Sequence, residues 1–399
     1  MKPRIPAVVA GGNLNGLGVV RSLARAAIPT FVMNTTRNCP AAWSRHANFV
    51  HTPSLSDTPF VSALQQLAST LKCRPVLFLT HDTSVATVST HRSELAPYYH
   101  IEMPAPNVVH ELSDKLAFDS LAARENFLVP RSRAIRHHTD LEHIAQLSPP
   151  LILKPADKSH ALAGAVERTV RAETLEEARN IADSMLTHTP ALIVQEWIEG
   201  PDSEIFFTLF CAKADGTPAA LFSGRKLASN PPSVGSTAIC IPETEIAELL
   251  EQETRTFLKR VPYRGLGSLE FKRDIRTGKL MIIEPTVGRT DWQEEVATLC
   301  GKNLPAIAYC LSLDCELPRP PPNTRPYQHA WRSDRSFCLP PDWPGVPRIT
   351  DAHFRIADPL PGIYFYAYER GIRRISRRLK KLLFNRLMKN PVIEASDSP

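Results

Sequence analysis

Short apolar runs alternate with helix-like segments over the first hundred residues. Three runs have the length of buried strands, and a glycine-rich turn (Gly11–Gly18) and a helical pattern follow the first run. Parallel strands need a crossover between them, and that crossover is usually a helix. The pattern therefore predicts an α/β unit with a parallel sheet, whose strands include Ala7–Ala10, Thr30–Met33 and Pro75–Thr80.

The next region mixes capped helices with further strands. Ser113 is the predicted N-cap of a helix that ends near Asn126, and Thr174 with Glu177 makes a capping box for a second helix. Apolar strands are predicted at LILKPAD and at ALIVQEWIEG, on either side of this second helix. We therefore expect an α+β unit to follow the α/β unit.

Two β-hairpins and two helices are predicted beyond it. The hairpins turn at Asp215–Gly216 and Arg276–Gly278, and the helices cover about Thr244 to Arg260 and Gln293–Cys300. Nine prolines between residues 318 and 347 argue against a helix or a central strand in that stretch. We expect it to be a proline-rich wrap or a linker.

The composition is that of a soluble globular protein. Hydrophobic residues make up 43% of the 399 residues and charged residues 22%, which excludes wholesale disorder. No apolar run approaches the ~20 residues of a membrane span, and the N-terminal apolar stretch is too short for a signal peptide. The eight cysteines form no CxxC pair and are typical of reduced thiols. We expect a cytoplasmic protein.

Basic residues are concentrated near the C-terminus. The chain has 47 Lys and Arg against 41 Asp and Glu, but residues 370–389 hold nine Lys or Arg and no acid, so the remainder carries −3. The body therefore predicts no nucleic-acid binding. Ile372, Ile375, Leu379 and Leu382 recur at helical spacing within the basic segment. Such an amphipathic helix either packs on the body, contacts an anionic membrane surface or binds an acidic partner.

The glycine turn at Gly11–Gly18 has two readings. A strand, a glycine turn and a helix N-terminus together form a natural anion site. However, the spacing is not that of a dinucleotide fingerprint, and Asn34 and Thr35 stand where a ribose-binding acid is needed. We therefore favour a structural turn over an oxidoreductase site.

Two lysines occupy unusual places. Lys115 lies in the first turn of a predicted helix, and Lys154 lies at the end of an apolar strand. Lysines are rarely buried without a partner, so phosphate binding accounts for both positions, whereas each taken alone fits a solvated lysine.

The segment QEWIEGPDSE follows another apolar strand. The exposed peptide edge at Glu196 and Ile198 fits recognition of a purine, with Trp197 beside it, and Glu204 could accept from ribose hydroxyls. The alternative is that Trp197 belongs to the core and the acids to the surface.

Two carboxylates close neighbouring strands of the second hairpin. Glu270 ends LGSLE and Glu284 ends LMIIE, so both side chains should lie on one face of the sheet. Their repulsion is relieved by a shared divalent cation, and oxygen ligands suit Mg²⁺ together with phosphate. Thr286 points to the same side as Glu284, and Arg289 follows as a donor suited to phosphate or carboxylate.

The order of these features resembles the ATP-grasp superfamily over about residues 5–313. The matching features are Lys115, Lys154, Gln195–Ile198, Glu270 and Glu284. The strings GRKLASNPPSVGS and EPTVGRTDWQEEVATLCGKNLP further resemble the carboxylate–amine ligase-like branch, which is similar to carbamoyl-phosphate synthase and D-aspartate ligase. The resemblance implies an N-terminal, Rossmann-like preATP-grasp domain followed by a two-subdomain ATP-grasp fold.

The resemblance also implies domain boundaries. We expect the preATP-grasp domain at 1–108, the small ATP-grasp subdomain at 109–190 and the large subdomain at 191–316. The proline-rich wrap would cover 317–368, and the basic helix and tail 369–399.

The resemblance assigns each matched residue to nucleotide binding, metal binding or catalysis. For ATP, Lys115 and Lys154 would contact phosphates, Glu196 and Ile198 the adenine edge with Gln195 and Trp197 beside them, and Glu204 the ribose. For Mg²⁺ the ligands would be Glu270, Glu284 and Thr286, and for catalysis the candidates are Arg289, Lys226 and Arg225.

The implied reaction joins a small carboxylate to an amine. ATP would convert the carboxylate into an acyl phosphate, Arg289 would steady the oxyanion, and an amine would attack. Substrate choice would lie in Gly224–Ser236 and Thr290–Gln293, with an amino acid or small peptide as substrate. His81–Asp82 and His137–His138 are interpreted as loop residues. A homodimer is a further expectation.

Two departures from the family pattern keep alternatives open. Thr286 replaces the usual asparagine ligand, and the loop after Lys154 has a single glycine, Gly164. They motivate the alternative of an ATP-binding protein without turnover. Another ATP-grasp reaction, either carboxylation or phosphoryl transfer, is the remaining alternative.

Overall fold

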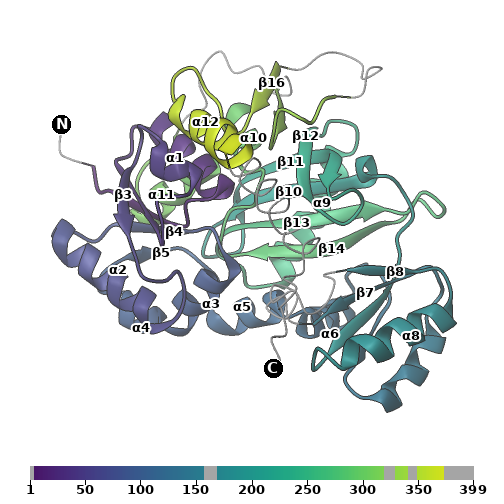
Figure 1. The fold of residues 1–399 in the computed structure, drawn as a ribbon. Coiled ribbons are helices and arrows are strands. Elements are labelled where there is room, and N and C mark those ends of the chain that lie inside the picture. The colour runs from purple at the N-terminus through teal and green to yellow at the C-terminus, as the bar shows by residue number, and fades with distance from the viewer. Residues whose placement is uncertain (1–3, 157–168, 319–328, 340–347, 373–399) are drawn as a thin grey trace, which may run out of the picture.

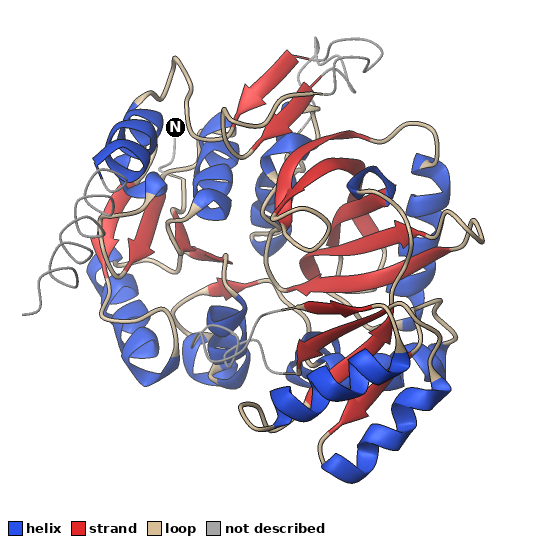
Figure 2. Ribbon diagram, turned by 45° about the vertical axis from the view of Figure 1, so that its right-hand side comes forward, coloured by secondary structure: helices blue, strands red, loops and turns tan. Residues whose placement is uncertain are grey.

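Three β-sheets and the helices around them make up the chain (Figures 1 and 2). The computed structural model describes residues 4–156, 169–318, 329–339 and 348–372. A parallel sheet lies in the N-terminal unit, a four-stranded sheet in the small subdomain, and a seven-stranded sheet in the large subdomain between them.

The N-terminal sheet has the strand order β3-β2-β1-β4-β5, and all its pairs are parallel, which confirms the predicted α/β unit. The strands β1, β2 and β4 are largely apolar and buried, as expected of strands covered on both faces. The elements of this unit are β1 (Ala7–Ala10), α1 (Leu14–Arg25), β2 (Thr30–Asn34), η1 (Pro40–Trp43), β3 (Asn48–His51), α2 (Asp57–Leu71), β4 (Val76–Leu79), α3 (Asp82–Thr90), α4 (Arg92–Leu95) and β5 (His100–Ile101).

The glycine turn is shorter than the sequence suggests. Helix α1 begins at Leu14, so Gly16 and Gly18 lie inside the helix. Gly11 has a φ of +105°, which favours glycine, and a Cβ on Gly16 would lie 2.0 Å from the Gly11 carbonyl oxygen. These glycines therefore serve a tight connection between β1 and α1.

The small subdomain has the strand order β6-β9-β7-β8. Asp114 rather than Ser113 caps α6, because its Oδ1 accepts from the amides of Leu116 (3.0 Å) and Ala117 (2.8 Å). Thr174 caps α8 as predicted, accepting from the Glu177 amide at 3.1 Å. Its elements, with the preceding helix, are α5 (Pro106–Ser113), α6 (Lys115–Glu125), β6 (Ser132–Ile135), η2 (His138–Gln146), β7 (Leu151–Pro155), β8 (Val170–Ala172), α8 (Leu175–Leu186) and β9 (Leu192–Glu196).

The large sheet has the order β14-β13-β10-β11-β12-β15-β16. Both predicted hairpins are present, as the antiparallel pairs β10–β11 and β13–β14. The elements here are η3 (Asp202–Glu204), β10 (Ile205–Ala212), β11 (Pro218–Asn230), β12 (Ser236–Pro242), α9 (Ala247–Arg260), β13 (Gly265–Arg273), β14 (Leu280–Val287), α10 (Glu295–Leu299), α11 (Leu304–Ser312), β15 (His329–Arg332) and β16 (Arg348–Asp351).

Two strands differ from the sequence expectation. The expectation that 318–347 holds no central strand is wrong, because β15 pairs with β12 on one side and β16 on the other. Its residues lie in a stretch, 327–339, that contains no proline, so their amides remain free to pair. Strand β9, expected in the large subdomain, pairs with β6 and β7 of the small one.

The C-terminal part of the described chain ends in two short helices. These are α12 (Leu360–Ile363) and a π-helical turn, η4 (Tyr364–Ile372). Most of the predicted basic amphipathic helix, from residue 373 onward, lies outside the described residues. Within the described residues, no helix combines the length and apolar character needed to cross a bilayer. All eight cysteines are free thiols.

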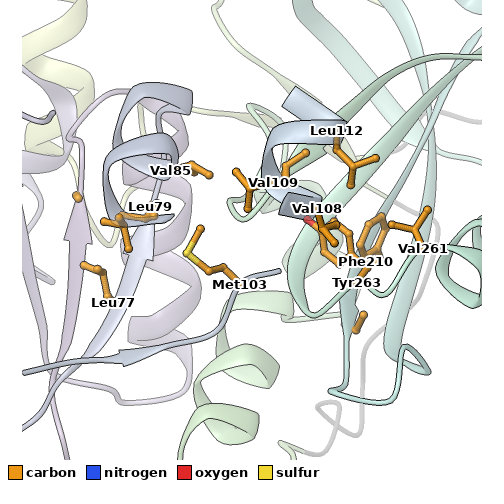
Figure 3. Close-up of a cluster of buried hydrophobic side chains, with 14 of the residues drawn as sticks. Leu77, Leu79, Val85, Met103, Val108, Val109, Leu112, Phe210, Val261 and Tyr263 are labelled. Carbon is orange, nitrogen blue, oxygen red and sulfur yellow. The ribbon is translucent and has the colours of Figure 1, made fainter. Parts of the chain in front are cut away.

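Two hydrophobic clusters show how the three units of the chain pack. One hydrophobic cluster joins the N-terminal unit to the large sheet, and Figure 3 shows Leu79, Val85 and Met103 on one side and Phe210 and Tyr263 on the other. A separate cluster lies within the small subdomain, between residues 135 and 194. The small subdomain therefore has its own core, whereas the other two units share theirs.

Candidate active site

A cleft of about 550 Å³ lies between the small subdomain and the large sheet. Its walls come from β7, the end of β9, the β11–β12 region and the β13–β14 hairpin. Most of the predicted site residues line it, namely Lys115, Lys154, Gln195, Glu196, Trp197, Ile198, Lys226, Glu270, Glu284, Thr286 and Arg289.

The two predicted carboxylates face each other. Glu270 on β13 is the direct partner of Glu284 on β14, and Ser268 is the partner of Thr286 two residues further along. A bulge after Glu270 shifts the pairing, so that Phe271 pairs with Ile282 and Ile283 is left over. The strand period therefore brings both carboxylates to the cleft, as the sequence predicts.

Lys226 on β11 joins this group. Its Nζ lies 2.6 Å from Glu270 Oε2, and only 4% of the lysine is exposed. Burial alone would lower the pKa of Lys226, but Glu270 with Asp291 and Glu284 raises it. Burial raises the pKa of the Glu270 carboxyl, against the pull of Lys226. Lys226 and Glu270 therefore form an ion pair at the wall of the cleft.

The donor set fits a magnesium ion that also binds phosphate. Mg²⁺ is usually held by one or two carboxylates, with substrate phosphates and waters as the other ligands. Glu270 and Glu284 supply two such carboxylates in one cleft. Among the described residues no group of three or more His, Cys, Asp or Glu side chains is gathered to hold a metal. The two carboxylates of the cleft suit an ion whose other ligands are phosphate oxygens and waters.

Both predicted phosphate lysines are held by polar partners on the small subdomain. Lys154 Nζ donates to Gln195 Oε1 at 3.0 Å, which links neighbouring strands β7 and β9. Lys115, the first residue of α6, donates to the Pro155 carbonyl at 3.4 Å. The two ammonium groups thus lie at the same edge of the small sheet.

The segment after β9 forms another part of the cleft wall. The Glu196 amide donates to the Arg131 carbonyl at 2.9 Å, and the Trp197 amide donates to the Pro150 carbonyl at 2.9 Å. Trp197 is 8% exposed and lines the cleft, so it is both buried and part of the site. This combines the two alternatives that the sequence left open.

Lys272 is a lining residue that sequence reasoning missed. Its Nζ lies 4.3 Å from the centre of the Trp197 ring, and burial lowers the pKa of its ammonium. The signal was present, because Lys272 is two residues beyond Glu270 on β13 and so lies on the same face.

Arg225 and Glu204 do not line the cleft. Arg225 Nε donates to the Ser203 carbonyl at 2.8 Å and lies over the Phe206 ring, because successive strand residues face opposite sides and Lys226 takes the cleft side. Glu204 accepts from Arg273 Nε at 2.6 Å. We therefore leave both out of the proposed site.

Asp82 enters the site from the N-terminal unit. Its Oδ1 accepts from Arg289 Nε at 2.6 Å, across 207 residues of chain. The interpretation of His81–Asp82 as loop residues apart from the site is wrong for Asp82. Asp82 follows the carboxyl end of β4, which is where open α/β sheets place ligand-binding residues. His138 pairs with Asp183 on the small subdomain at 2.6 Å and does not line the cleft.

Arg289 is held in a defined place by this contact. Burial opposes its charge, but Asp82, Asp291 and Glu284 raise the pKa of its guanidinium. Its neighbour Thr290 donates its hydroxyl to Asn15 Oδ1 at 2.5 Å, and Asn15 Nδ2 donates back to the Thr290 carbonyl at 2.8 Å. The loop after β14 is thus anchored on the first turn of α1 in the N-terminal unit.

Comparisons with known proteins agree with this architecture. No family model matches the chain. The D-aspartate ligase of Enterococcus faecium is 24% identical in an alignment of 316 residues, and the match covers 74% of each chain.

Three of the solved structures with a similar fold are complexes with a nucleotide. The N5-carboxyaminoimidazole synthetase of Staphylococcus aureus complexed with ADP has a TM-score of 0.62 at 14% identity, covering 80% of each chain. The carboxyaminoimidazole ribonucleotide synthase of Aspergillus clavatus complexed with ATP has a TM-score of 0.60 at 16% identity, and the match covers 83% of this chain and 81% of the other. Biotin carboxylase from Campylobacter jejuni has a TM-score of 0.62 at 13% identity, and the match covers 82% of this chain and 74% of the other. These structures show that the chain has the ATP-grasp fold, and with the match to D-aspartate ligase they confirm the resemblance to the ATP-grasp superfamily.

Proposed function

We propose that the chain is an ATP-dependent ligase that joins a carboxylate to an amine through an acyl phosphate, with an amino acid or small peptide as a substrate. The observation that carries this proposal is the facing pair Glu270 and Glu284 in a cleft that also holds Lys115, Lys154 and Arg289. The similarity to a D-aspartate ligase supports the same reaction class.

The small subdomain is proposed to bind ATP. Lys115 and Lys154 lie at one edge of its sheet and would compensate phosphate charge. The Glu196 amide is already used within the protein, which makes the Glu196 carbonyl and the Ile198 amide the groups proposed to meet the adenine edge. Trp197 and the stem of Lys272 would line the space beside the base.

Glu270 and Glu284 are the proposed ligands of Mg²⁺, with Thr286 beside them. When bound, Mg²⁺ would neutralise charge on the phosphate oxygens during phosphoryl transfer. Lys226 keeps a positive charge against Glu270 and would help to place the carboxylate substrate near the terminal phosphate.

The protein's own contribution to the reaction is positioning and charge. A carboxylate becomes a good acyl donor once a phosphoryl group is attached, because phosphate is a good leaving group. Arg289, held by Asp82, would donate to the oxyanion that forms when the amine attacks the acyl carbon. No nucleophilic side chain is required for these two reaction steps.

Location and assembly are proposed from the sequence pattern. The acid-free basic segment 370–389 supports contact with an anionic membrane surface of a cytoplasmic protein. The negative charge of the remaining chain argues against nucleic-acid partners. A homodimer is proposed on the family resemblance alone.

An ADP-release screen tests the proposed function. The protein, ATP and Mg²⁺ are combined with pools of amino acids and small dicarboxylates as acids, and with amino acids or hydroxylamine as amines. We expect ADP only when both an acid and an amine are supplied. ATP binding without ADP in any pool would favour a nucleotide-binding protein without turnover.

Three variants serve as controls in this screen. Glu270→Gln and Glu284→Gln should each lower ADP formation at least about 100-fold, because each removes a proposed Mg²⁺ ligand. Thermal melting should be unchanged in Glu284→Gln, whereas Glu270→Gln should also lower the melting temperature because it leaves Lys226 without its carboxylate. Lys154→Ala should raise the KM for ATP more than the KM for the amine, because its charge acts on the nucleotide. Near-normal ADP formation in both glutamine variants would overturn the metal assignment.

A further inference from the structure

Asp291 lies in the cleft and has no part in the proposed binding of nucleotide or metal. It follows Arg289 on the loop after β14 and lines the same space as Lys226 and Glu270. Its Oδ1 accepts from the Trp292 amide at 2.7 Å, and its Oδ2 accepts from Ser268 Oγ at 3.2 Å. The carboxylate is thereby fixed against β13.

A buried glutamine holds the carboxylate from the other side. Gln293 Nε2 donates to Asp291 Oδ2 at 3.2 Å, while Gln293 Oε1 accepts from Thr237 Oγ1 on β12 at 3.1 Å. Gln293 is 1% exposed, so this relay is shielded from water. The hydrogen bonds orient the glutamine amide with its NH₂ group toward Asp291.

The hydrogen-bond donors to Asp291 distinguish it from three other acids of the cleft. Asp82 pairs with Arg289, Glu196 with Arg131, and Glu270 with Lys226. Within the described residues, the three hydrogen bonds given to the Asp291 carboxylate all come from neutral donors. Lys226 and Arg289 lie near it, but each has its own carboxylate within 2.6 Å.

We propose that Asp291 binds the amino group of the acceptor substrate and takes its proton as the new bond forms. This inference rests on the proposed ligase function and names the acceptor class, a primary amine. A carboxylate held by neutral donors beside an anionic acyl phosphate attracts an amine and repels a second acid. The arginine and lysine nearby would serve the acyl group, whereas Asp291 serves the nitrogen.

The bound ammonium group first releases one proton to the solvent. The neutral amine that results donates one N–H to Asp291, and its lone pair forms the C–N bond to the acyl carbon. The C–O bond to the phosphoryl group then breaks, and its electron pair leaves with inorganic phosphate. The nitrogen proton passes to the Asp291 carboxylate and from there to the departing phosphate, which regenerates the carboxylate.

Hydroxylamine as the acceptor distinguishes proton removal by Asp291 from the earlier formation of the acyl phosphate. It is uncharged at neutral pH, and it traps acyl phosphates as hydroxamates without help from a base. We expect Asp291→Asn to lower ligation of amino acids or ammonia at least about 100-fold, which is the usual contribution of a general base. Hydroxamate formation should fall by less than about threefold, and Asp291→Glu should recover part of the ligation.

Other outcomes would overturn the inference. If Asp291→Asn loses hydroxamate and ligation equally, Asp291 acts on metal, nucleotide or loop position instead; if it loses neither, Asp291 has no role in the reaction. The matched control is Asp215→Asn in the exposed β10–β11 turn, which should resemble the wild type in both assays. If the wild type forms neither ADP nor hydroxamate with any acid, the proposed function itself fails, and the role of Asp291 falls with it.

Discussion

At the scale of single residues, two basic side chains of the cleft are paired with acids on elements that are distant in sequence. Lys226 on β11 pairs with Glu270 on β13, and Arg289 after β14 pairs with Asp82 of the N-terminal unit. A buried charge without a partner is costly, so each of these contacts also fixes the relative position of the elements that carry it. The electrostatics of the cleft are thus built into the packing.

Glu294 is a buried acid outside the cleft whose ionisation opposes folding. It accepts from Ser22 Oγ at 3.1 Å and from Thr298 Oγ1 at 3.0 Å, and it is 1% exposed. Burial, reinforced by Glu295, raises the pKa of Glu294 from 4.5 to about 8, against these hydrogen bonds. Between these two values the folded state holds a proton that the unfolded state has lost, so stability falls as the pH rises.

We therefore predict that Glu294→Gln flattens the pH dependence of stability. The wild type should lose at most about 4 kcal/mol of unfolding free energy between pH 5 and pH 8, and the variant should keep most of it. Chemical denaturation at several pH values measures this. Glu253→Gln, an exposed position on α9, should follow the wild-type profile. An unchanged slope in Glu294→Gln would show that Glu294 ionises freely in the folded protein.

At the scale of elements, one arginine joins the C-terminal segment to the first helix. Arg21 on α1 pairs with Asp358 (Nε to Oδ2, 3.0 Å) and donates to the carbonyls of Ala352 (2.6 Å) and His353 (2.8 Å). Ser44 Oγ donates to the same Asp358 oxygen at 2.9 Å. The segment after β16 is therefore fastened to the N-terminal unit by one nearly buried guanidinium.

We predict that Arg21→Met destabilises the protein by about 3–5 kcal/mol, because Asp358 is left as a buried charge without its partner. Limited proteolysis should cut first between residues 352 and 372. The double variant Arg21→Met with Asp358→Leu should recover much of this loss, because it removes the stranded charge as well. A double variant no more stable than Arg21→Met would show that the carbonyl contacts, and not the ion pair, hold the segment.

At the scale of the whole molecule, the cleft lies where two separately packed bodies meet. The N-terminal unit and the large sheet share hydrophobic clusters, whereas the small subdomain packs around its own residues. Lys154 belongs to the small body, and Glu270, Glu284 and Arg289 belong to the large one. Lys115 lies on α6, whose Phe118 and Leu121 pack in the cluster of the large body. A nucleotide bound between them would therefore contact both bodies at once.

The basic C-terminal segment makes a prediction for the full chain. Its nine Lys and Arg over 370–389 should draw the protein to anionic vesicles, at about 1 kcal/mol for each basic residue near the surface. We expect the full chain to co-sediment with phosphatidylserine vesicles at low salt, and a chain ending at Ile372 to stay in solution. Neutral vesicles serve as the control. Equal, salt-insensitive behaviour of both chains would assign the segment to packing or to a protein partner instead.

Local patterns predicted much of the site. The strand period placed Glu270 and Glu284 on one face, and the ends of predicted elements pointed to Lys115 and Lys154, all of which line the cleft. The same patterns did not predict one helix cap and one strand pairing, because these depend on the contacts of individual residues. The cap of α6 moved by one residue to Asp114, and β15 formed within the proline-rich region.

The sequence by itself determined the order of elements, the parallel N-terminal sheet, the two hairpins and the carboxylate pair. These depend on periodicity and turn chemistry over a few residues, which the chain carries locally. Only the tertiary structure decided that Asp82 holds Arg289, that Lys226 rather than Arg225 faces the cleft beside Glu270, and that Thr237 holds Gln293 against Asp291. These contacts join residues that are tens to hundreds of positions apart, and the packing of separate elements brings them together, which no local period records.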